Sequence, residues 1–132
     1  MTANQSVFDY QTNEDILIVT PVRDFRMVRD SDIRDAYNET YRQLTCDSVC
    51  HLIFNFSNLS YIDSTFVGIM IRLAKKARDG GGKMVLCHLS DEIRGILKQL
   101  MLLETPNIAS FWKRAETLEI ALEGLQSKQA EE

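Results

Sequence analysis

The sequence has no run of about 18 apolar residues, so no membrane-spanning segment is expected. The first residues, MTANQSVFDY, lack the basic stretch followed by an apolar stretch that marks a signal peptide. A basic excess is also missing, and the net charge of −4 disfavours nucleic-acid binding, which depends on basic patches that release counterions from phosphates. These absences predict a cytoplasmic protein that binds neither membranes nor nucleic acids.

Cysteine is scarce, and its spacing is unlike that of a metal site. The three cysteines are an odd number without a CxxC pair, which fits a reducing compartment. Two Cys–His pairs occur, Cys50–His51 and Cys87–His88. On parallel strands these pairs would be offset by roughly 16 Å, whereas zinc ligands lie about 2 Å from one ion. We therefore expect no metal, no cofactor, and buried or half-buried structural cysteines.

Length and composition indicate one globular domain. The chain of 132 residues is long enough to bury a core, and its 45% hydrophobic and 26% charged residues are ordinary for such a domain. Repeats and low-complexity segments are missing. We expect a single domain over residues 1–132, with a core at about 6–125 and a frayed C-terminal tail. The sequence carries no signal for an oligomeric state.

Hydrophobic periodicity predicts strands that alternate with helices. The predicted strands cover residues 6–11, 16–20, 51–57, 83–89 and 107–112. The predicted helices cover residues 31–45, 64–79, about 91–101 and 114–126. This order predicts an α/β fold with a mixed, mostly parallel sheet of four to five strands and about four helices.

Local signals refine this prediction. Asp30 or Ser31 is expected to cap the first helix, and Ser90 the third. Phe111 and Trp112 are expected to pack beneath the last helix. The charged segment before the first helix contains Arg23, Asp24, Arg26, Arg29 and Asp30, and is interpreted as a solvated loop that is also positioned to join a docking surface.

The stretch YIDSTFVGIM, residues 61–70, places a carboxylate and two hydroxyls where an apolar strand gives way to an apolar helix. In alternating α/β folds this edge of the sheet is where ligands and partners bind. The plain interpretation of Asp63 and Ser64 is a helix cap, worth about 1 kcal/mol. The remainder of the helix favours a second role.

At 100° per residue, Ser64, Gly68 and Lys75 fall on the exposed side of this helix, with Arg72 beside them and Ile71 at the boundary. Glycine inside a helix costs about 1 kcal/mol relative to alanine, and a solvated surface has no need of it. A surface that another protein's backbone approaches closely does need glycine at such a position. We therefore predict a docking face formed by Asp63, Ser64, Gly68, Ile71, Arg72 and Lys75.

Catalytic interpretations of the same residues are weaker. A nucleophile elbow needs glycine two residues before and after the serine, where Ile62 and Phe66 stand instead. His88 is placed to approach Ser64, but a serine and a histidine without an orienting acid are weak evidence. The GGGK stretch at residues 80–83 follows a helix and lacks the trailing Ser or Thr of a phosphate-binding loop, so it is interpreted as a turn. We expect no catalytic activity.

The strand LIFNFSNLSYI running into DSTFVG, followed by an amphipathic helix, resembles the STAS domain of bacterial anti-anti-sigma factors, and the order of elements matches over nearly the whole chain. The resemblance implies an anti-sigma factor antagonist. It implies that Ser64 is phosphorylated by the partner, an anti-sigma factor with serine kinase activity, and dephosphorylated by a PP2C-type phosphatase. The unphosphorylated form would bind the anti-sigma factor and free the sigma factor. Thr65 is a second, weaker candidate acceptor.

Two features depart from the family pattern. Phe66 stands where the family commonly has glycine, and the segment VTPVRDF lacks a glycine that is often found there. Phe66 falls on the buried face, where we expect it to fill core volume. The resemblance also implies an alternative function, that of a constitutive scaffold subunit of a lipid-transport or signalling complex.

Overall fold

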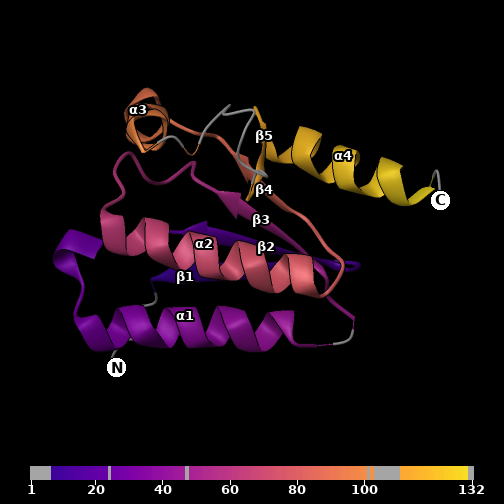
Figure 1. Ribbon diagram of the computed structural model, residues 1–132, viewed down its shortest axis with the longest axis horizontal. Coiled ribbons are helices and arrows are strands. Elements are labelled where there is room, and N and C mark those ends of the chain that lie inside the picture. Colours follow the sequence, from indigo (N-terminus) through magenta and orange to yellow (C-terminus); the bar gives the residue numbers. More distant parts are fainter. Residues whose placement is uncertain (1–6, 24, 47, 101, 103–110, 131–132) are drawn as a thin grey trace.

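Five strands pair into one sheet in the computed structural model, which describes residues 7–23, 25–46, 48–100, 102 and 111–130 (Figure 1). The strands are β1 (Phe8–Asn13), β2 (Ile16–Pro21), β3 (His51–Asn55), β4 (Met84–Cys87) and β5 (Lys113–Ala115). The helices are α1 (Asp30–Leu44), α2 (Ser64–Asp79), α3 (Asp91–Gln99) and α4 (Leu118–Ala130), with a 3-10 turn at Phe25–Met27.

The strand order in the sheet follows the chain, β1-β2-β3-β4-β5. A tight turn at residues 14–15 joins β1 to β2 as an antiparallel hairpin, and the other neighbouring strands are parallel. Parallel neighbours need a crossover connection, which α1, α2 and α3 provide. The predicted α/β fold with a mixed, mostly parallel sheet and four helices is confirmed.

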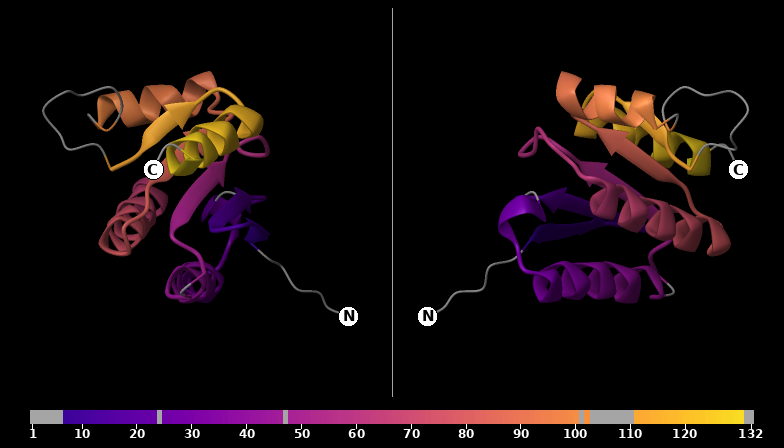
Figure 2. Two further views of the ribbon diagram at one scale, coloured as in Figure 1. Left: turned by 90° about the vertical axis from the view of Figure 1, so that its right-hand side faces the viewer. Right: turned by 60° about the vertical axis from the view of Figure 1, so that its left-hand side comes forward.

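The sheet is covered on both faces, which explains why its central strands are mostly apolar. Side chains alternate between two cores. Leu52 and Phe54 of β3 belong to the larger core, which α1, α2 and α3 cover. Ile53 belongs to the smaller core, which Ala121 and Leu125 of α4 cover. Figure 2 shows α4 on the opposite side of the sheet from α1 and α2.

The C-terminal part of the fold departs from the sequence prediction. The last strand is β5 at Lys113–Ala115 rather than residues 107–112. Phe111 and Trp112 lie outside any strand, and residues 107–110 fall outside the described part of the chain. Helix α4 consequently begins at Leu118 rather than at residue 114. A three-residue strand with mostly exposed side chains has too little periodicity to be recognised in a sequence.

Phe111 and Trp112 do not pack beneath the last helix. Both belong to the larger core, on the face that α4 does not cover. The Trp112 indole N–H donates to the carbonyl oxygen of Leu102 at 3.0 Å. The prediction failed because the chain reaches β5 from the side of the sheet that α2 and α3 cover.

Helix α1 is held by a contact to β1 rather than by the predicted cap. Its N-cap is Arg29, which makes no side-chain capping hydrogen bond, so the prediction of Asp30 or Ser31 is wrong. The Tyr10 hydroxyl lies 3.1 Å from the Ala36 carbonyl oxygen and 2.8 Å from Thr40 Oγ1. Burial raises the pKa of Tyr10 to about 12, so this hydroxyl stays protonated. These bonds fix α1 beside the sheet.

Helix α3 has the cap that the sequence predicts. Ser90 Oγ accepts the backbone N–H of Ile93 at 3.1 Å. The acidic residues Asp91 and Glu92 occupy the first turn, where the helix dipole favours negative charge.

Candidate functional site

At the start of α2, Asp63 caps the helix and Ser64 lies at the surface. Asp63 is the N-cap, with an extended backbone, and its Oδ1 accepts the N–H of Phe66 at 2.9 Å. Ser64 then occupies the first helical position and is exposed. Within the described part of the chain its hydroxyl makes no hydrogen bond. Because Asp63 caps the helix, the Ser64 hydroxyl is available to react or to bind.

Buried neighbours hold Ser64 in this orientation. Ile62 is 1% exposed and Phe66 is fully buried, so the chain is anchored two residues before and two residues after the serine. The Phe66 ring packs against four other aromatic rings, with centroid distances of 4.7–6.2 Å: Phe8, Phe25, Phe54 and Phe56. Phe66 therefore fills core volume, as expected from the sequence. The nearest of these rings, Phe25, attaches the 3-10 turn to the start of α2.

A groove of about 530 Å³ runs between α1 and α2 and contains the Ser64 position. Its α2 wall consists of Ser64, Thr65, Gly68, Ile69 and Arg72, and its α1 wall of Asp30, Ile33, Arg34 and Tyr37. A Cβ atom on Gly68 would meet no atom within 4 Å, so the glycine opens the groove without being required by packing. The groove has an apolar floor and charged rims.

The predicted docking residues separate into two groups around α2. Ser64, Gly68 and Arg72 line the groove, whereas Asp63, Ile71 and Lys75 do not. Ile71 is half-buried against the larger core. Lys75 is exposed, with its Nζ 6.0 Å from the centre of the Phe111 ring. Helical periodicity identified the outward side of α2 but not the side on which α1 packs.

Sequence reasoning missed most of the α1 wall. The sequence predicts a charged loop that contains Asp30, and no sequence pattern assigns Ile33, Arg34 or Tyr37 to the site. Their contribution depends on two helices lying side by side, which no local pattern reveals (Figure 1). The Arg72 guanidinium lies 5.9 Å above the Tyr37 ring and links the two walls.

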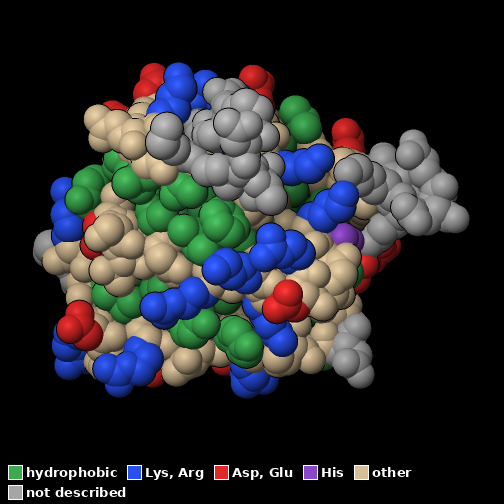
Figure 3. Space-filling view, in the orientation of Figure 1, with side chains coloured by type: hydrophobic (Ala, Val, Ile, Leu, Met, Phe, Trp, Pro, Cys, Tyr) green, Lys and Arg blue, Asp and Glu red, His purple; other side chains and the backbone are tan. Residues whose placement is uncertain are grey.

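Basic side chains gather over α2, although the chain as a whole is acidic (Figure 3). Arg72 lies over Tyr37, and Lys76 lies 4.9 Å over the Tyr41 ring. The groove itself carries two cations, Arg34 and Arg72, against one carboxylate, Asp30. A local positive field of this kind favours an acidic binding partner.

His88 is occupied elsewhere and is not a base for Ser64. Its Nε2 accepts the backbone N–H of Leu118 at 3.1 Å, at the start of α4. The ring nitrogen that carries the lone pair is thus engaged in a structural bond. His88 also has a positive φ of 56°, and its backbone N–H donates to the Glu116 carbonyl oxygen at 3.2 Å. The serine–histidine interpretation therefore lacks the required geometry.

The GGGK stretch is a turn in the structure. Gly81 has a φ of 86°, which favours glycine. A Cβ atom on Gly82 would lie 1.7 Å from the Cys50 carbonyl oxygen, so only glycine allows the chain to approach the start of β3 this closely. Both glycines serve the connection from α2 to β4.

A cluster of Asp15, Cys50 and His51 lies at the opposite edge of the sheet, with candidate ligand atoms within 4.8 Å of one another. Cys50 Sγ donates to Asp15 Oδ2 at 3.5 Å, and His51 Nε2 lies 3.9 Å from the same oxygen. The backbone N–H of Lys83 donates to His51 Nδ1 at 3.0 Å, which places the proton of the neutral ring on Nε2. A metal-binding histidine instead donates its second nitrogen, so the cluster suits hydrogen bonding better than metal binding.

The cysteines differ in exposure. Cys87 is fully buried, and burial raises the pKa of its thiol to about 12. Cys50 is half-buried, and burial together with Asp15 raises its pKa. Cys46 is exposed, so the expectation of buried or half-buried cysteines is wrong for this residue, which follows the end of α1.

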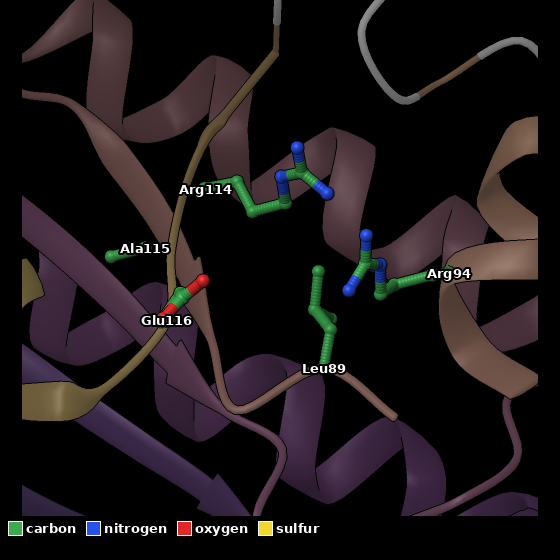
Figure 4. A pocket seen from close by; sticks show the side chains of 5 residues that line it. All are labelled: Leu89, Arg94, Arg114, Ala115 and Glu116. Atoms are coloured by element: carbon green, nitrogen blue, oxygen red, sulfur yellow. The ribbon is translucent and has the colours of Figure 1, made fainter. Parts of the chain in front are cut away.

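A second hollow, of about 420 Å³, lies beside β5 and α3 and is lined by Leu89, Arg94, Arg114, Ala115 and Glu116 (Figure 4). Its three charged side chains are exposed, and the carboxylate offsets part of the positive charge. The hollow shares no lining residue with the α1–α2 groove. The groove is therefore the stronger candidate site.

None of the described helices has the length and apolar composition that a bilayer crossing requires.

Comparisons with solved structures show the same fold in proteins of low identity. A variant of RsbS from Moorella thermoacetica is 18% identical, with a TM-score of 0.75 over 95% of this chain and 99% of that chain. Unphosphorylated SpoIIAA from Bacillus is 17% identical, with a TM-score of 0.73 over 91% and 96%. An anti-sigma-factor antagonist domain protein from Planctomyces limnophilus is 14% identical, with a TM-score of 0.72 over 90% and 97%.

These identities establish likeness of fold alone. The family assignment rests on the sequence: the model of the STAS domain matches residues 7–115, which is most of the chain. The chain belongs to the STAS domain family.

Proposed function

We propose that this chain is an anti-sigma factor antagonist, a cytoplasmic, non-catalytic binding module whose affinity for its partner is switched by phosphorylation of Ser64. The partner is an anti-sigma factor with serine kinase activity, which the unphosphorylated chain sequesters so that a sigma factor is freed. A PP2C-type phosphatase restores the unphosphorylated form. The docking surface comprises the α1–α2 groove and the adjoining exposed side of α2.

The observation that carries this proposal is the exposed Ser64 hydroxyl, which makes no hydrogen bond to any described residue. Asp63 supplies the helix cap at 2.9 Å, so Ser64 can change chemically without removing a structural bond. Ser64 itself lines the groove, and Gly68 lines it one helical turn further along α2. Together they give a kinase both an acceptor hydroxyl and a surface on which to dock.

Phosphorylation changes charge and bulk at one end of the groove. The Ser64 oxygen forms a bond to the γ-phosphorus of ATP, the bond to the ADP oxygen breaks, and the hydroxyl proton passes to a base on the kinase. The phosphate carries nearly two negative charges, which a helix N-terminus tolerates. Acidic groups on the partner repel this charge and so weaken binding. An affinity change of about five- to 150-fold would be sufficient for a switch.

Relatives support the proposal by analogy. SpoIIAA has been solved in an unphosphorylated and in a phosphorylated form, and both share this fold, with TM-scores of 0.73 and 0.65. That protein exists in two phosphorylation states without losing the fold. We extend this behaviour to Ser64 because Ser64 is exposed at the start of α2, and the sequence resemblance implies phosphorylation of this serine.

Two substitutions at Ser64 test the switch. Ser64→Ala is expected to bind the anti-sigma factor as the unmodified chain does, because the hydroxyl makes no hydrogen bond to the residues that the structure describes. Ser64→Asp is expected to bind at least about fivefold more weakly, because it places a negative charge at the rim of the groove. Isothermal titration calorimetry against an anti-sigma factor with serine kinase activity from the same host measures both. Equal affinities would contradict the proposal.

Substitution of Gly68 tests the docking surface independently of phosphorylation. Gly68→Arg is expected to abolish binding without lowering the thermal midpoint, since a Cβ atom there meets nothing within 4 Å. Gly124→Arg is the matched control, because Gly124 is an exposed glycine of α4 with equally open surroundings. Binding by Gly68→Arg at full affinity would show that the partner docks elsewhere.

A constitutive scaffold subunit is the alternative function for the same fold. A component of the stressosome, a signal integration and transduction hub, is 16% identical, with a TM-score of 0.69. A scaffold of this kind would retain its assembly when Ser64 is replaced by Asp. Transporter genes beside this gene favour the scaffold, and kinase or phosphatase genes favour the switch.

A further inference from the structure

Two arginines from different helices line the groove that contains Ser64. Arg34 belongs to α1 and Arg72 to α2, so the two cations stand on opposite walls. Both side chains are exposed. Among the described residues neither forms an ion pair, and Arg72 lies only against the Tyr37 ring, at 5.9 Å. The groove thus holds positive charge that the described structure does not neutralise locally with a salt bridge.

The helical geometry directs these side chains toward the serine. α1 and α2 lie side by side and begin at the same end of the molecule (Figures 1 and 2). The Cα–Cβ bonds of a helix tilt toward its N-terminus, so from their positions in the groove Arg34 and Arg72 can extend toward the end at which Ser64 lies. Arg72 follows Ser64 by eight residues, which separates their Cα atoms by about 12 Å along the helix axis. The long arginine side chain and the phosphate on Ser64 both extend into this gap, which substantially shortens the distance between the two charged groups.

We propose that a phosphate on Ser64 is bound by Arg34 and Arg72 of the same chain. This inference rests on the proposed function, because it describes how the phosphorylated state of that site is held. The phosphate occupies the groove and engages the two cations that an acidic partner would otherwise contact. Phosphorylation then releases the partner by internal competition as well as by repulsion.

The groove also contains an opposing charge. Asp30 lies on the α1 wall, and Asp63 precedes Ser64 in the chain. If these carboxylates dominated, the second pKa of the phosphoserine would rise above its usual value of about 6. Binding by the two arginines lowers it instead. The direction of the change in the phosphoserine pKa therefore distinguishes binding by the two arginines from repulsion by the nearby carboxylates.

The test uses the full chain with phosphoserine installed at position 64 during synthesis, by an expanded genetic code. Phosphorus NMR follows the phosphoserine pKa in the otherwise unmodified chain and in an Arg34→Gln/Arg72→Gln variant. The charge-matched control is Lys75→Gln/Lys98→Gln, which removes two exposed lysines that do not line the groove. The helix N-terminus contributes equally in all three proteins.

The proposal predicts that the groove variant raises the phosphoserine pKa by about half a unit, the size expected for two partly screened charge pairs, and that the control raises it distinctly less. In nitrogen–proton spectra, the Nε–H signals of Arg34 and Arg72 are expected to shift on phosphorylation. An equal rise in both variants, or no shift of the arginine signals, would overturn the proposal.

This experiment is independent of the partner. Because the phosphate is installed during synthesis, the result does not depend on whether a kinase acts on Ser64. Loss of the arginine effect alone would leave the binding switch standing. Equal partner affinities of the Ser64 variants would reject the switch without altering the measured pKa.

Discussion

Asp63 and Ser64 are adjacent polar residues with different roles. Both are typical of helix caps, and their sequence did not decide between them. The structure assigns the cap to Asp63, whose carboxylate accepts the N–H of Phe66, and leaves Ser64 at the first helical position. This division explains how an exposed hydroxyl can occupy a helix start without serving as its cap.

The two residues should accordingly differ in their effect on stability. Asp63→Ala is expected to lower the free energy of unfolding by about 1 kcal/mol, the usual contribution of a capping side chain. Ser64→Ala is expected to change it by less than about 0.5 kcal/mol, as for a surface position without bonds. Urea denaturation measures both. A larger loss from Ser64→Ala would identify Ser64 as the cap.

Helices and strands could be predicted from the sequence where their hydrophobic pattern is long and amphipathic. Helix α2 spans Ser64–Asp79, the same limits that the sequence predicted, because a cap, a buried stripe and a glycine stop all agree. Strand β5 was misplaced because it is three residues long and mostly exposed. The α1 wall of the groove was missed because residues such as Arg34 acquire a role only through the packing of one helix beside another.

Gly68 and Gly82 should respond in opposite ways to substitution by alanine. Gly68→Ala is expected to raise the free energy of unfolding by about 1 kcal/mol, because alanine favours a helix and its Cβ meets no atom. Gly82→Ala is expected to lower it by about 1–3 kcal/mol, because its Cβ would lie 1.7 Å from a backbone oxygen where β3 begins. Thermal and urea unfolding measure both effects. Stabilisation by Gly82→Ala would contradict the described turn.

The proposed docking surface and the cluster of Asp15, Cys50 and His51 lie at opposite edges of the sheet. Ser64 follows the carboxyl end of β3, and the cluster of Asp15, Cys50 and His51 lies where β2 and β3 begin. The first location was predictable, since α/β folds bind at the carboxyl ends of their strands. The cluster was not, because Asp15 reaches His51 only when the β1–β2 turn packs beside β3.

His51 should make the stability of the protein depend on pH. Burial lowers its pKa below the ordinary 6.5, while Asp15 acts in the opposite direction and Lys83 adds to the lowering. At a pH between the pKa of His51 in the folded chain and its pKa in the unfolded chain, the unfolded chain binds more protons. The free energy of unfolding therefore falls as the pH drops through 6.5. His51→Gln, which keeps an acceptor for the Lys83 N–H, is expected to flatten this dependence between pH 8 and pH 5.5 in urea denaturation. An unchanged slope would exclude His51 as its source.

The central claim, that Ser64 is the regulated residue, is tested most directly by mass spectrometry of the protein purified from its own host. Trypsin releases Ser64 and Thr65 together in the peptide of residues 43–72, in which fragmentation locates a phosphate. The account predicts a phosphate on Ser64 in part of the population. A phosphate on another residue, or an unmodified peptide under every growth condition, would contradict it.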